Sequence, residues 1–312
     1  MLPVIHQIAP GFSAGDAIGN QMVKMRALFR AWGYDSQVYA PVRDKRIPDP
    51  GLDPARYVSS PENVLIYHYS TYTPLSAWVN SLPDFVICYF HNVTPPEFFA
   101  PYDADFAARL ALGRQDVAIF KDRPRAWAGS AYNRADLLMA GFRQVDVVPY
   151  FLYFDDLQMA LQSVEAQKII EAYDDGWVNW LFVGRLAPNK RQDDIICAFA
   201  YYHRLINSHS RLFLVGSDGG LPQYRAELEL LAARMIPAHI HLPGAVSLES
   251  LAGYYRTASV FVSMSEHEGF CIPLLEAMNF DIPALAFKAA AVPDTLGGAG
   301  VLVNEKRYDI IA

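Results

Sequence analysis

Several features of secreted, membrane-spanning and disulfide-rich proteins are scarce or missing in this 312-residue sequence. Its three cysteines, Cys88, Cys197 and Cys271, are odd in number, widely spaced and embedded in apolar segments. We therefore expect reduced thiols and a cytoplasmic protein. The first residues lack the basic start and long apolar stretch of a signal peptide, and no apolar run approaches the roughly 18 residues that span a bilayer. Any membrane contact would be peripheral.

Charge is also sparse, at 19% of residues, against about a quarter in typical domains. The sequence has 26 Lys and Arg against 33 Asp and Glu, so its net charge is −7, which argues against broad electrostatic capture of nucleic acid. Up to residue 153 it has 14 basic and 14 acidic residues, and beyond that point 12 and 19. An anion bound by the second half would need a few well-placed cations.

Length and pattern predict two α/β domains, each a doubly wound parallel sheet. We assign 1–153 to the first domain, the polar, Asp-rich stretch 154–176 to a linker, and 177–312 to the second domain. Strands are expected at 2–9, 37–40, 64–69, 85–90, 126–129, 145–149, 178–183, 212–215, 239–242, 260–264 and 284–287. Helices are expected at 21–32, 75–82, 105–120, 133–140, 192–206, 223–235, 248–258 and 273–279.

The most informative segment, 265–278, reads SEHEGFCIPLLEAM and joins an apolar strand to a helix. Glu268 would lie at the carboxyl end of the strand, where open α/β sheets bind ligands, and Glu276 about one turn inside the helix. Gly269 permits close backbone approach, and the free N–H groups of the helix start favour an anion. Two carboxylates beside an anion site suit a ligand with phosphate and hydroxyl groups, such as a sugar nucleotide. The plainer alternative is a solvated acidic loop.

A second segment, FVGRLAPNKR, ends the first strand of the second domain. Arg185 offers a planar fork for phosphate oxygens, and Lys190 adds a point charge five residues later. On one turn facing the sheet crevice, they would form a diphosphate clamp. The alternative is that Lys190 and Arg191 pair with Asp193 or Asp194 on a surface loop.

Taken in order, Gly-Arg-Leu-x-x-x-Lys and Glu-x7-Glu resemble the GT4 family of retaining glycosyltransferases. The stretch 292–300, VPDTLGGAG, also resembles the family's region just past the site. The resemblance covers nearly the whole chain and implies a GT-B architecture. In that architecture two Rossmann-like domains face each other across a cleft, with the nucleotide held by the second and the acceptor mainly by the first.

Residue by residue, the resemblance implies donor contacts in the second domain. Arg185 and Lys190 match positions that contact the donor diphosphate, Glu268 the glutamate that hydrogen-bonds the donor sugar, and Glu276 the one that holds the ribose hydroxyls. The predicted catalytic group consists of Arg185, Lys190, Glu268 and His91.

Main-chain contacts are implied as well. Gly269, Phe270 and Cys271 would present backbone N–H groups to phosphate and sugar, and Val246 would contact the base through main-chain atoms. Cys271 replaces the family's usual glycine, which leaves less space for the sugar.

In the first domain, two positions match the family. Gly15, in a glycine-bearing loop that is not a G-x-G-x-x-G fingerprint, would approach the donor phosphate and sugar. His91, after the apolar run 85–90, would lie close to the donor sugar. A plain turn and a structural histidine are the alternatives. His267 has a weaker case, as a neighbour that orients its loop.

Neither a metal-ligand cluster nor the Asp-x-Asp signature of metal-dependent glycosyltransferases is present in the sequence. We therefore expect no metal and no other cofactor. Residues 307–312 resemble the first turn of another helix, and the family usually continues further. The chain is thus expected to lack the family's final helices.

The leading hypothesis is a retaining, metal-independent transferase. It would move a hexose such as mannose, glucose or an N-acetylhexosamine from a UDP-, GDP- or ADP-sugar to a glycan, lipid-linked or small-molecule acceptor. A sugar-nucleotide epimerase of the same architecture and a non-catalytic sugar-nucleotide-binding partner of another transferase remain alternatives. A nicotinamide dehydrogenase is more distant, because the dinucleotide fingerprint is absent.

Overall fold

The computed structural model describes residues 4–13, 15–236 and 238–312. The chain forms two units, one of Met1–Ala100 with Ala104–Leu152 and the other of Pro101–Asp103 with Tyr153–Ala312. Each described unit is built on a six-stranded sheet whose strand pairs are all parallel.

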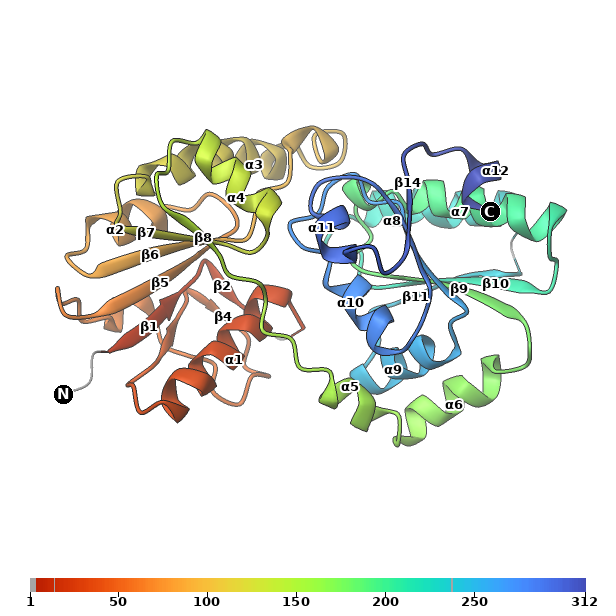
Figure 1. Ribbon diagram of the computed structural model, residues 1–312, viewed down its shortest axis with the longest axis horizontal. Coiled ribbons are helices and arrows are strands. Elements are labelled where there is room, and N and C mark those ends of the chain that lie inside the picture. Colours follow the sequence, from red (N-terminus) through yellow and green to blue (C-terminus); the bar gives the residue numbers. More distant parts are fainter. Residues whose placement is uncertain (1–3, 14, 237) are drawn as a thin grey trace. The chain divides into compact units, whose positions relative to one another are not determined.

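The sheet of the first unit has the order β3-β1-β5-β6-β7-β8. Helix α1 covers one face, and α2, α3 and α4 cover the other (Figure 1). The strands are β1 (Ile5–Ile8), β3 (Val38–Tyr39), β5 (Val64–Tyr69), β6 (Phe85–Phe90), β7 (Arg125–Ala128) and β8 (Val145–Val147), with β2 (Gly11–Phe12) and β4 (Val42–Arg43) in a small second sheet. The helices are α1 (Ala17–Ala31), α2 (Leu75–Ser81), α3 (Ala104–Asp116) and α4 (Ala131–Met139), with the 3₁₀ turns η1 (Pro54–Arg56), η2 (Pro96–Phe98) and η3 (Val117–Phe120).

The two central strands, β5 and β6, are apolar along almost their whole length because both faces of the sheet are covered. Their tyrosines are completely buried, so each hydroxyl needs a partner. Tyr67 bonds the hydroxyl of Ser76 at 3.0 Å. Tyr69 donates to the Gly113 carbonyl and Tyr89 to the Val148 carbonyl, both at 2.7 Å.

A series of buried side-chain hydrogen bonds crosses the first unit at the ends of these strands. The Gln7 amide donates to the Met22 carbonyl at 3.0 Å, so its oxygen accepts from Nε2 of His68, also at 3.0 Å. His68 Nδ1 must then accept from Nε2–H of His91 at 2.9 Å, and His91 Nδ1 accepts from the Tyr150 hydroxyl at 2.8 Å. This series of hydrogen bonds therefore fixes both imidazoles as neutral tautomers.

We expect this neutral pair to make the folded state sensitive to acid. Burial lowers the pKa of His68 to about 3, and burial with the neighbouring His68 lowers that of His91 well below its usual value. The unfolded chain takes up these protons near pH 6.5, so stability is greatest above pH 6.5 and falls between pH 6.5 and 3. The expected slope is up to about 1.4 kcal/mol per pH unit for each ring.

Urea unfolding at pH 7.5, 6.5 and 5.5 measures this slope. His68→Gln should flatten it, whereas the matched change at the exposed His209 should not. Equal slopes for the two variants would contradict the assignment to the buried pair.

The sheet of the second unit has the order β11-β10-β9-β12-β13-β14. Helices α7, α8 and α12 lie on one face, and α9 with α5 and α6 on the other (Figure 1). The strands are β9 (Val178–Val183), β10 (Ser210–Val215), β11 (Ile240–Gly244), β12 (Val260–Ser263), β13 (Ala284–Phe287) and β14 (Val301–Val303). The helices are α5 (Asp155–Ala160), α6 (Val164–Tyr173), α7 (Gln192–Leu205), α8 (Pro222–Met235), α9 (Leu248–Thr257), α10 (Ile272–Asn279), α11 (Val292–Leu296) and α12 (Tyr308–Ile311), with the turn η4 (Pro188–Lys190).

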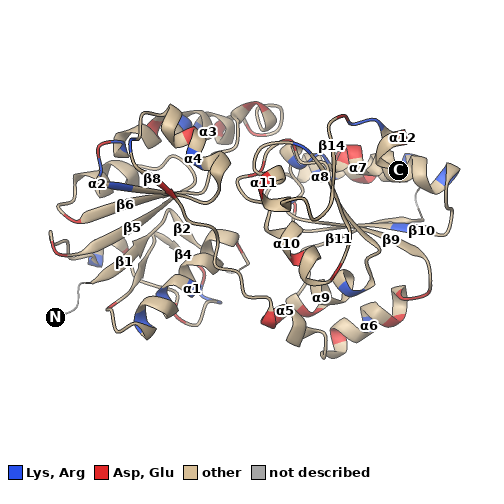
Figure 2. Ribbon diagram, viewed as in Figure 1, with Lys and Arg blue, Asp and Glu red and all other residues tan. Residues whose placement is uncertain are grey.

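Residues 154–176 do not form the linker that their composition predicts. They form α5 and α6, which pack on α9 within the second unit. Ala166 is fully buried, and its carbonyl oxygen would lie 2.9 Å from a Cβ added to Gly253 of α9. Acidic residues at the start of α5 and on α6 (Figure 2) mask this buried face in the sequence.

Most predicted elements agree with the structure. The strands at 178–183 and 284–287 have the predicted bounds, and the expected final helical turn is α12. The strand predicted at 2–9 is seen as Ile5–Ile8, with residues 2 and 3 outside the described part. Short elements such as β2, β4, β14 and α11 went unpredicted. In the described part of the chain, no helix is both long and apolar enough to cross a membrane.

Candidate functional site

The strand order of the second unit brings the two sequence motifs together. Strands β9 and β12 are neighbours, while the chain leaves β9 towards β10 on its other side. This is a topological switch point, outside which open α/β sheets bind ligands at the carboxyl ends of their strands. The loop at 184–191 follows β9 and the loop at 264–271 follows β12, so both motifs lie there.

Arg185 in the loop after β9 is exposed, and its stem lies against the chain at Gly219. A Cβ added to Gly219 would come within 2.1 Å of Arg185 Cδ, and its φ of +58° also favours glycine. The Arg185 carbonyl accepts from the side chain of buried Gln192 at 3.0 Å. Gln192 is held in turn by the Tyr224 hydroxyl at 3.1 Å. Gly219 was not predicted as a site residue, because only this contact with Arg185 reveals its role.

The loop after β12 is tied to the body of the unit by its carbonyl groups. The Glu268 carbonyl accepts from the Ala291 amide at 3.2 Å, and the Phe270 carbonyl accepts from the Thr295 hydroxyl. Cys271 is buried and begins α10 in the left-handed region, with φ of +74°. The family's usual glycine suits this conformation without strain.

The Cys271 thiol lies in the apolar core of the unit and beside Glu268. Burial, reinforced by the Glu268 carboxylate, raises its pKa well above the usual value. The thiol is therefore protonated at neutral pH and is no candidate nucleophile. Gly269, half-buried, lies between Glu268 and this helix start.

Lys190 and Glu268, predicted from separate motifs, form an ion pair. Lys190 Nζ lies 2.5 Å from Glu268 Oε1, and their side chains are 20% and 9% exposed. The alternative of a decorative surface cation therefore fails for Lys190. Arg191 does form the predicted pairs, with Asp193 at 2.9 Å and Asp194 at 3.1 Å, but it also pairs with Glu266 of the other loop at 2.8 Å.

Glu276 lies on α10, as predicted, and is half-buried. Its Oε2 accepts from the Tyr255 hydroxyl of α9 at 2.7 Å, which orients the carboxylate. Val246 lies between β11 and α9, half-buried against the same core. The donor contacts of both residues stay predictions.

Asn189 links the two loops and was missed from the sequence, where it looks like an ordinary turn residue. Its carbonyl accepts from the Glu266 amide at 2.8 Å, and its side-chain amide donates to the His267 carbonyl at 3.0 Å. Because Asn189 precedes Lys190, these bonds set the spacing of Lys190 and Glu268.

In the first unit, Gly15 lies in the predicted strand-to-helix turn and His91 at the predicted strand end. Gly15 is exposed in the turn before α1, with a φ of +76° that favours glycine. His91 directly follows β6, is 7% exposed, and uses both ring nitrogens in the series of buried hydrogen bonds described above. Contact between His91 and a donor sugar stays a prediction, and it requires one of these bonds to open.

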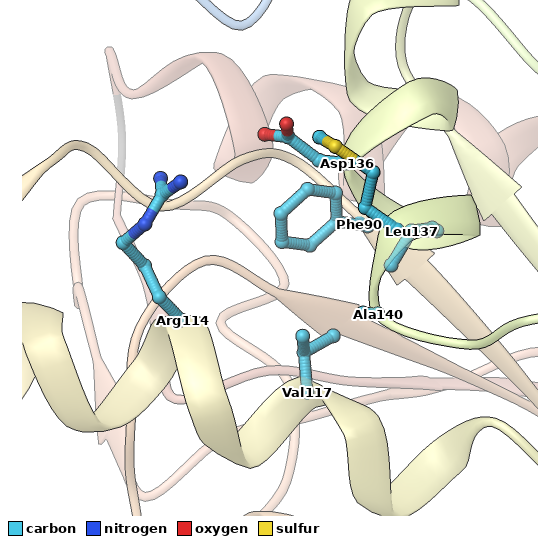
Figure 3. A pocket seen from close by; sticks show the side chains of 7 residues that line it. Phe90, Arg114, Val117, Asp136, Leu137 and Ala140 are labelled. Atoms are coloured by element: carbon cyan, nitrogen blue, oxygen red, sulfur yellow. The ribbon is translucent and has the colours of Figure 1, made fainter.

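A hollow of about 240 Å³ lies between α3 and α4 of the same unit. In Figure 3, Arg114 lies to the left of the Phe90 ring and the Asp136 carboxylate lies above it. Burial raises the pKa of Asp136, partly offset by Arg114. The remaining lining is apolar, with Val117, Leu137, Met139 and Ala140. None of these seven residues was predicted as a site residue.

Metal ligation has no candidate in the described part of either unit, where no three His, Cys, Asp or Glu residues are placed to hold an ion. The expectation that no metal and no other cofactor is needed stays a prediction.

Comparisons with known proteins relate the second unit to a family. Residues 165–312 match the family model described as glycosyl transferases group 1. O-antigen chain mannosyltransferase B of Escherichia coli is 25% identical over 260 residues, 76% of this chain and 66% of that protein. D-inositol 3-phosphate glycosyltransferase of Streptomyces avermitilis is 32% identical over 131 residues, 40% of this chain and 28% of that protein. The chain thus matches about two thirds of the length of the first relative and under a third of the second.

Solved structures show the same architecture. Sucrose-phosphate synthase from Thermosynechococcus elongatus aligns with a TM-score of 0.74 and 18% identity, covering 98% of this chain and 87% of that one. HepE of Anabaena, solved with UDP and glucose, aligns with a TM-score of 0.73 and 16% identity, covering 99% and 89%. These likenesses show the GT-B fold. The family match over residues 165–312 places this segment, which lies in the second unit, among the group 1 glycosyl transferases.

Proposed function

We propose that this chain is a retaining, metal-independent transferase that moves a hexose from a nucleotide-diphosphate sugar to a saccharide acceptor. The observation that carries the proposal is the Lys190–Glu268 pair at the switch point of the family-matched unit. A cation and a carboxylate side by side suit a ligand with phosphate next to sugar hydroxyls.

The pair also suggests how the donor is engaged. The donor diphosphate draws Lys190 away from Glu268 and is clamped by Lys190 and Arg185, while amides from Gly269 to Cys271 contact phosphate and sugar. Glu268, released from its cation, accepts from sugar hydroxyls. Glu276 accepts from the ribose hydroxyls, and Val246 meets the base through its main chain. Phosphate binding thus frees the carboxylate that holds the sugar.

For the donor, the relatives favour hexoses. One is named a mannosyltransferase and acts on an O-antigen chain by its name, and HepE was solved with UDP and glucose. We therefore place mannose first and glucose second, with a glycan or lipid-linked glycan as acceptor, the enzyme working in the cytoplasm with at most peripheral membrane contact. Thermal unfolding with GDP-mannose, UDP-glucose and ADP-glucose tests the donor, because a ligand at 100 times its Kd adds about 2.7 kcal/mol. No shift with any of the three would contradict the proposal.

The proposed chemistry gives a stereochemical prediction. Glu268 on the sugar hydroxyls is away from the anomeric carbon, so no carboxylate is assigned as a nucleophile there. Arg185, Lys190 and the loop amides stabilise the departing diphosphate, and the acceptor hydroxyl enters on the same face, giving its proton to a phosphate oxygen. We expect an α-linked product from an α-linked donor, formed undiminished in excess EDTA.

The anomeric proton in NMR spectra of the product checks the first part, and a chelator titration checks the second. A β-linked product would overturn retention. Activity lost in EDTA and restored by Mg²⁺ or Mn²⁺ would overturn metal independence.

Two alternatives keep the site but change the outcome. An epimerase would alter the sugar without transferring it, and a non-catalytic partner would bind the sugar nucleotide without turnover. Incubating the chain with labelled donor and acceptor separates them, because only a transferase puts label on the acceptor.

A further inference from the structure

Glu266, two residues before Glu268, is held by two cations from different segments. Its Oε1 lies 2.8 Å from Arg191 Nη1 and 2.6 Å from Lys306 Nζ. Lys306 belongs to the basic loop between β14 and α12, far along the chain from both motifs (Figure 2). Its side chain is only 15% exposed, so this contact is partly shielded from solvent.

The same cations also bind carboxylates at the start of α7. Lys306 Nζ lies 2.9 Å and Arg191 Nη2 lies 3.1 Å from Asp194 Oδ2, whose side chain is 7% exposed. Arg191 further grips Asp193 through Nε and Nη2. We call these five residues, Arg191, Asp193, Asp194, Glu266 and Lys306, the Glu266 clamp.

The clamp joins the two donor loops through ion pairs between side chains, in addition to the two hydrogen bonds that Asn189 makes between them. Arg191 follows Lys190 directly and has a φ of +53°, a conformation that a residue with a side chain keeps only when its contacts hold it. Lys306 stands 4.7 Å over the Phe287 ring, which limits its freedom to move. Lys306 therefore connects the segment after β14 to the loop that carries Glu268, and its side chain is held in place at both contacts.

We propose that Lys306 is a positioning residue that acts through Glu266 to hold Glu268 for the donor sugar. The inference rests on the proposed function, in which Glu268 binds sugar hydroxyls. Without the Lys306 ammonium, Glu266 keeps only Arg191, and Asp194 competes for the same guanidinium. The loop after β12 then loosens, while Arg185 and Lys190 stay on their own loop. Sugar engagement should suffer more than diphosphate binding.

The test compares Lys306→Met with Lys288→Met, a matched change at an exposed lysine just after β13. We expect Lys306→Met to lower kcat about tenfold and to leave the Kd for free GDP and UDP within twofold. Lys306→Arg keeps the charge and should recover at least half of kcat. Glu266→Gln should resemble Lys306→Met, and adding it to Lys306→Met should cost little more, because both variants remove the Lys306–Glu266 contact.

Amide hydrogen exchange of the peptide spanning 264–271 gives a readout that does not need activity. It should speed up several-fold in Lys306→Met and in Glu266→Gln, and not in Lys288→Met. Equal exchange in all variants, or a loss of nucleotide affinity that matches the loss of kcat, would overturn the positioning role. If the parent chain proved inactive while exchange still rose in Lys306→Met, the proposed function would fail and the clamp's hold on the loop would stand. Should Lys306→Met not fold, Glu266→Gln gives the same comparison.

Discussion

Glu268→Gln is expected to lower sugar transfer about a hundredfold while strengthening the binding of free nucleoside diphosphate. The transfer loss follows because a misplaced donor sugar commonly costs a factor of about 10². The gain in affinity follows because Gln cannot hold Lys190 as an ion pair at 2.5 Å, so the ammonium is available to phosphate. The pair is partly buried, and releasing Lys190 should tighten binding roughly three- to tenfold, about 0.7–1.4 kcal/mol.

Calorimetry with GDP and UDP, beside a transfer assay, measures both effects. Glu276→Gln, the same change on α10, is the matched control. It should weaken nucleotide binding, because the Glu276 carboxylate faces the ribose in the proposed site. If Glu268→Gln lost its affinity for free nucleotide and Glu276→Gln kept it, the roles of the two glutamates would be reversed. Unchanged nucleotide affinity in Glu268→Gln would show that the ion pair does not compete with the donor.

Lys190→Ala is expected to weaken nucleoside diphosphate binding roughly 10- to 150-fold with little change in thermal stability. A charge-assisted phosphate contact is worth about 1.5–3 kcal/mol, which converts to that range. Its removal leaves the buried Glu268 without its cation, but the space vacated by the lysine side chain can admit water to the carboxylate. Titration of GDP and UDP in a calorimeter measures the affinity, and thermal unfolding without ligand measures the stability.

The double variant Lys190→Ala with Glu268→Gln sharpens this test. Once Lys190 is gone, Glu268→Gln has no cation to release and should bring no gain in affinity. A gain that persists in the double variant would mean that Glu268 repels the diphosphate directly. Parent-like nucleotide affinity in Lys190→Ala would show that Lys190 does not bind the donor diphosphate.

The α/β class and most long elements could be predicted because each buries one side of a regular pattern. Strands such as Val178–Val183 are apolar on both faces, and helices such as Gln192–Leu205 repeat their buried residues every three to four positions. The stretch at 154–176 escaped this reasoning. Acidic residues at the start of α5 and near both ends of α6 outweigh a narrow buried face, whose partner α9 lies some 80 residues further on.

By itself, the sequence determined the two loops in which chemistry is expected. Arg185, Lys190, Glu268 and Glu276 stand in motifs whose order and spacing resemble one family, and local rules place each after a strand or on a helix. Side-chain type and strand position are local properties, so they can be recognised without knowing what lies opposite.

Only the tertiary structure decided which groups meet. That Lys190 pairs with Glu268 while Arg191 turns to Asp193 and Asp194 depends on β9 and β12 being neighbours, a pairing between strands 77 residues apart. Lys306 reaches Glu266 only because β14 ends on the same side of the sheet. Contacts of this kind arise from sheet order and long-range packing, and no local pattern of residue types encodes them.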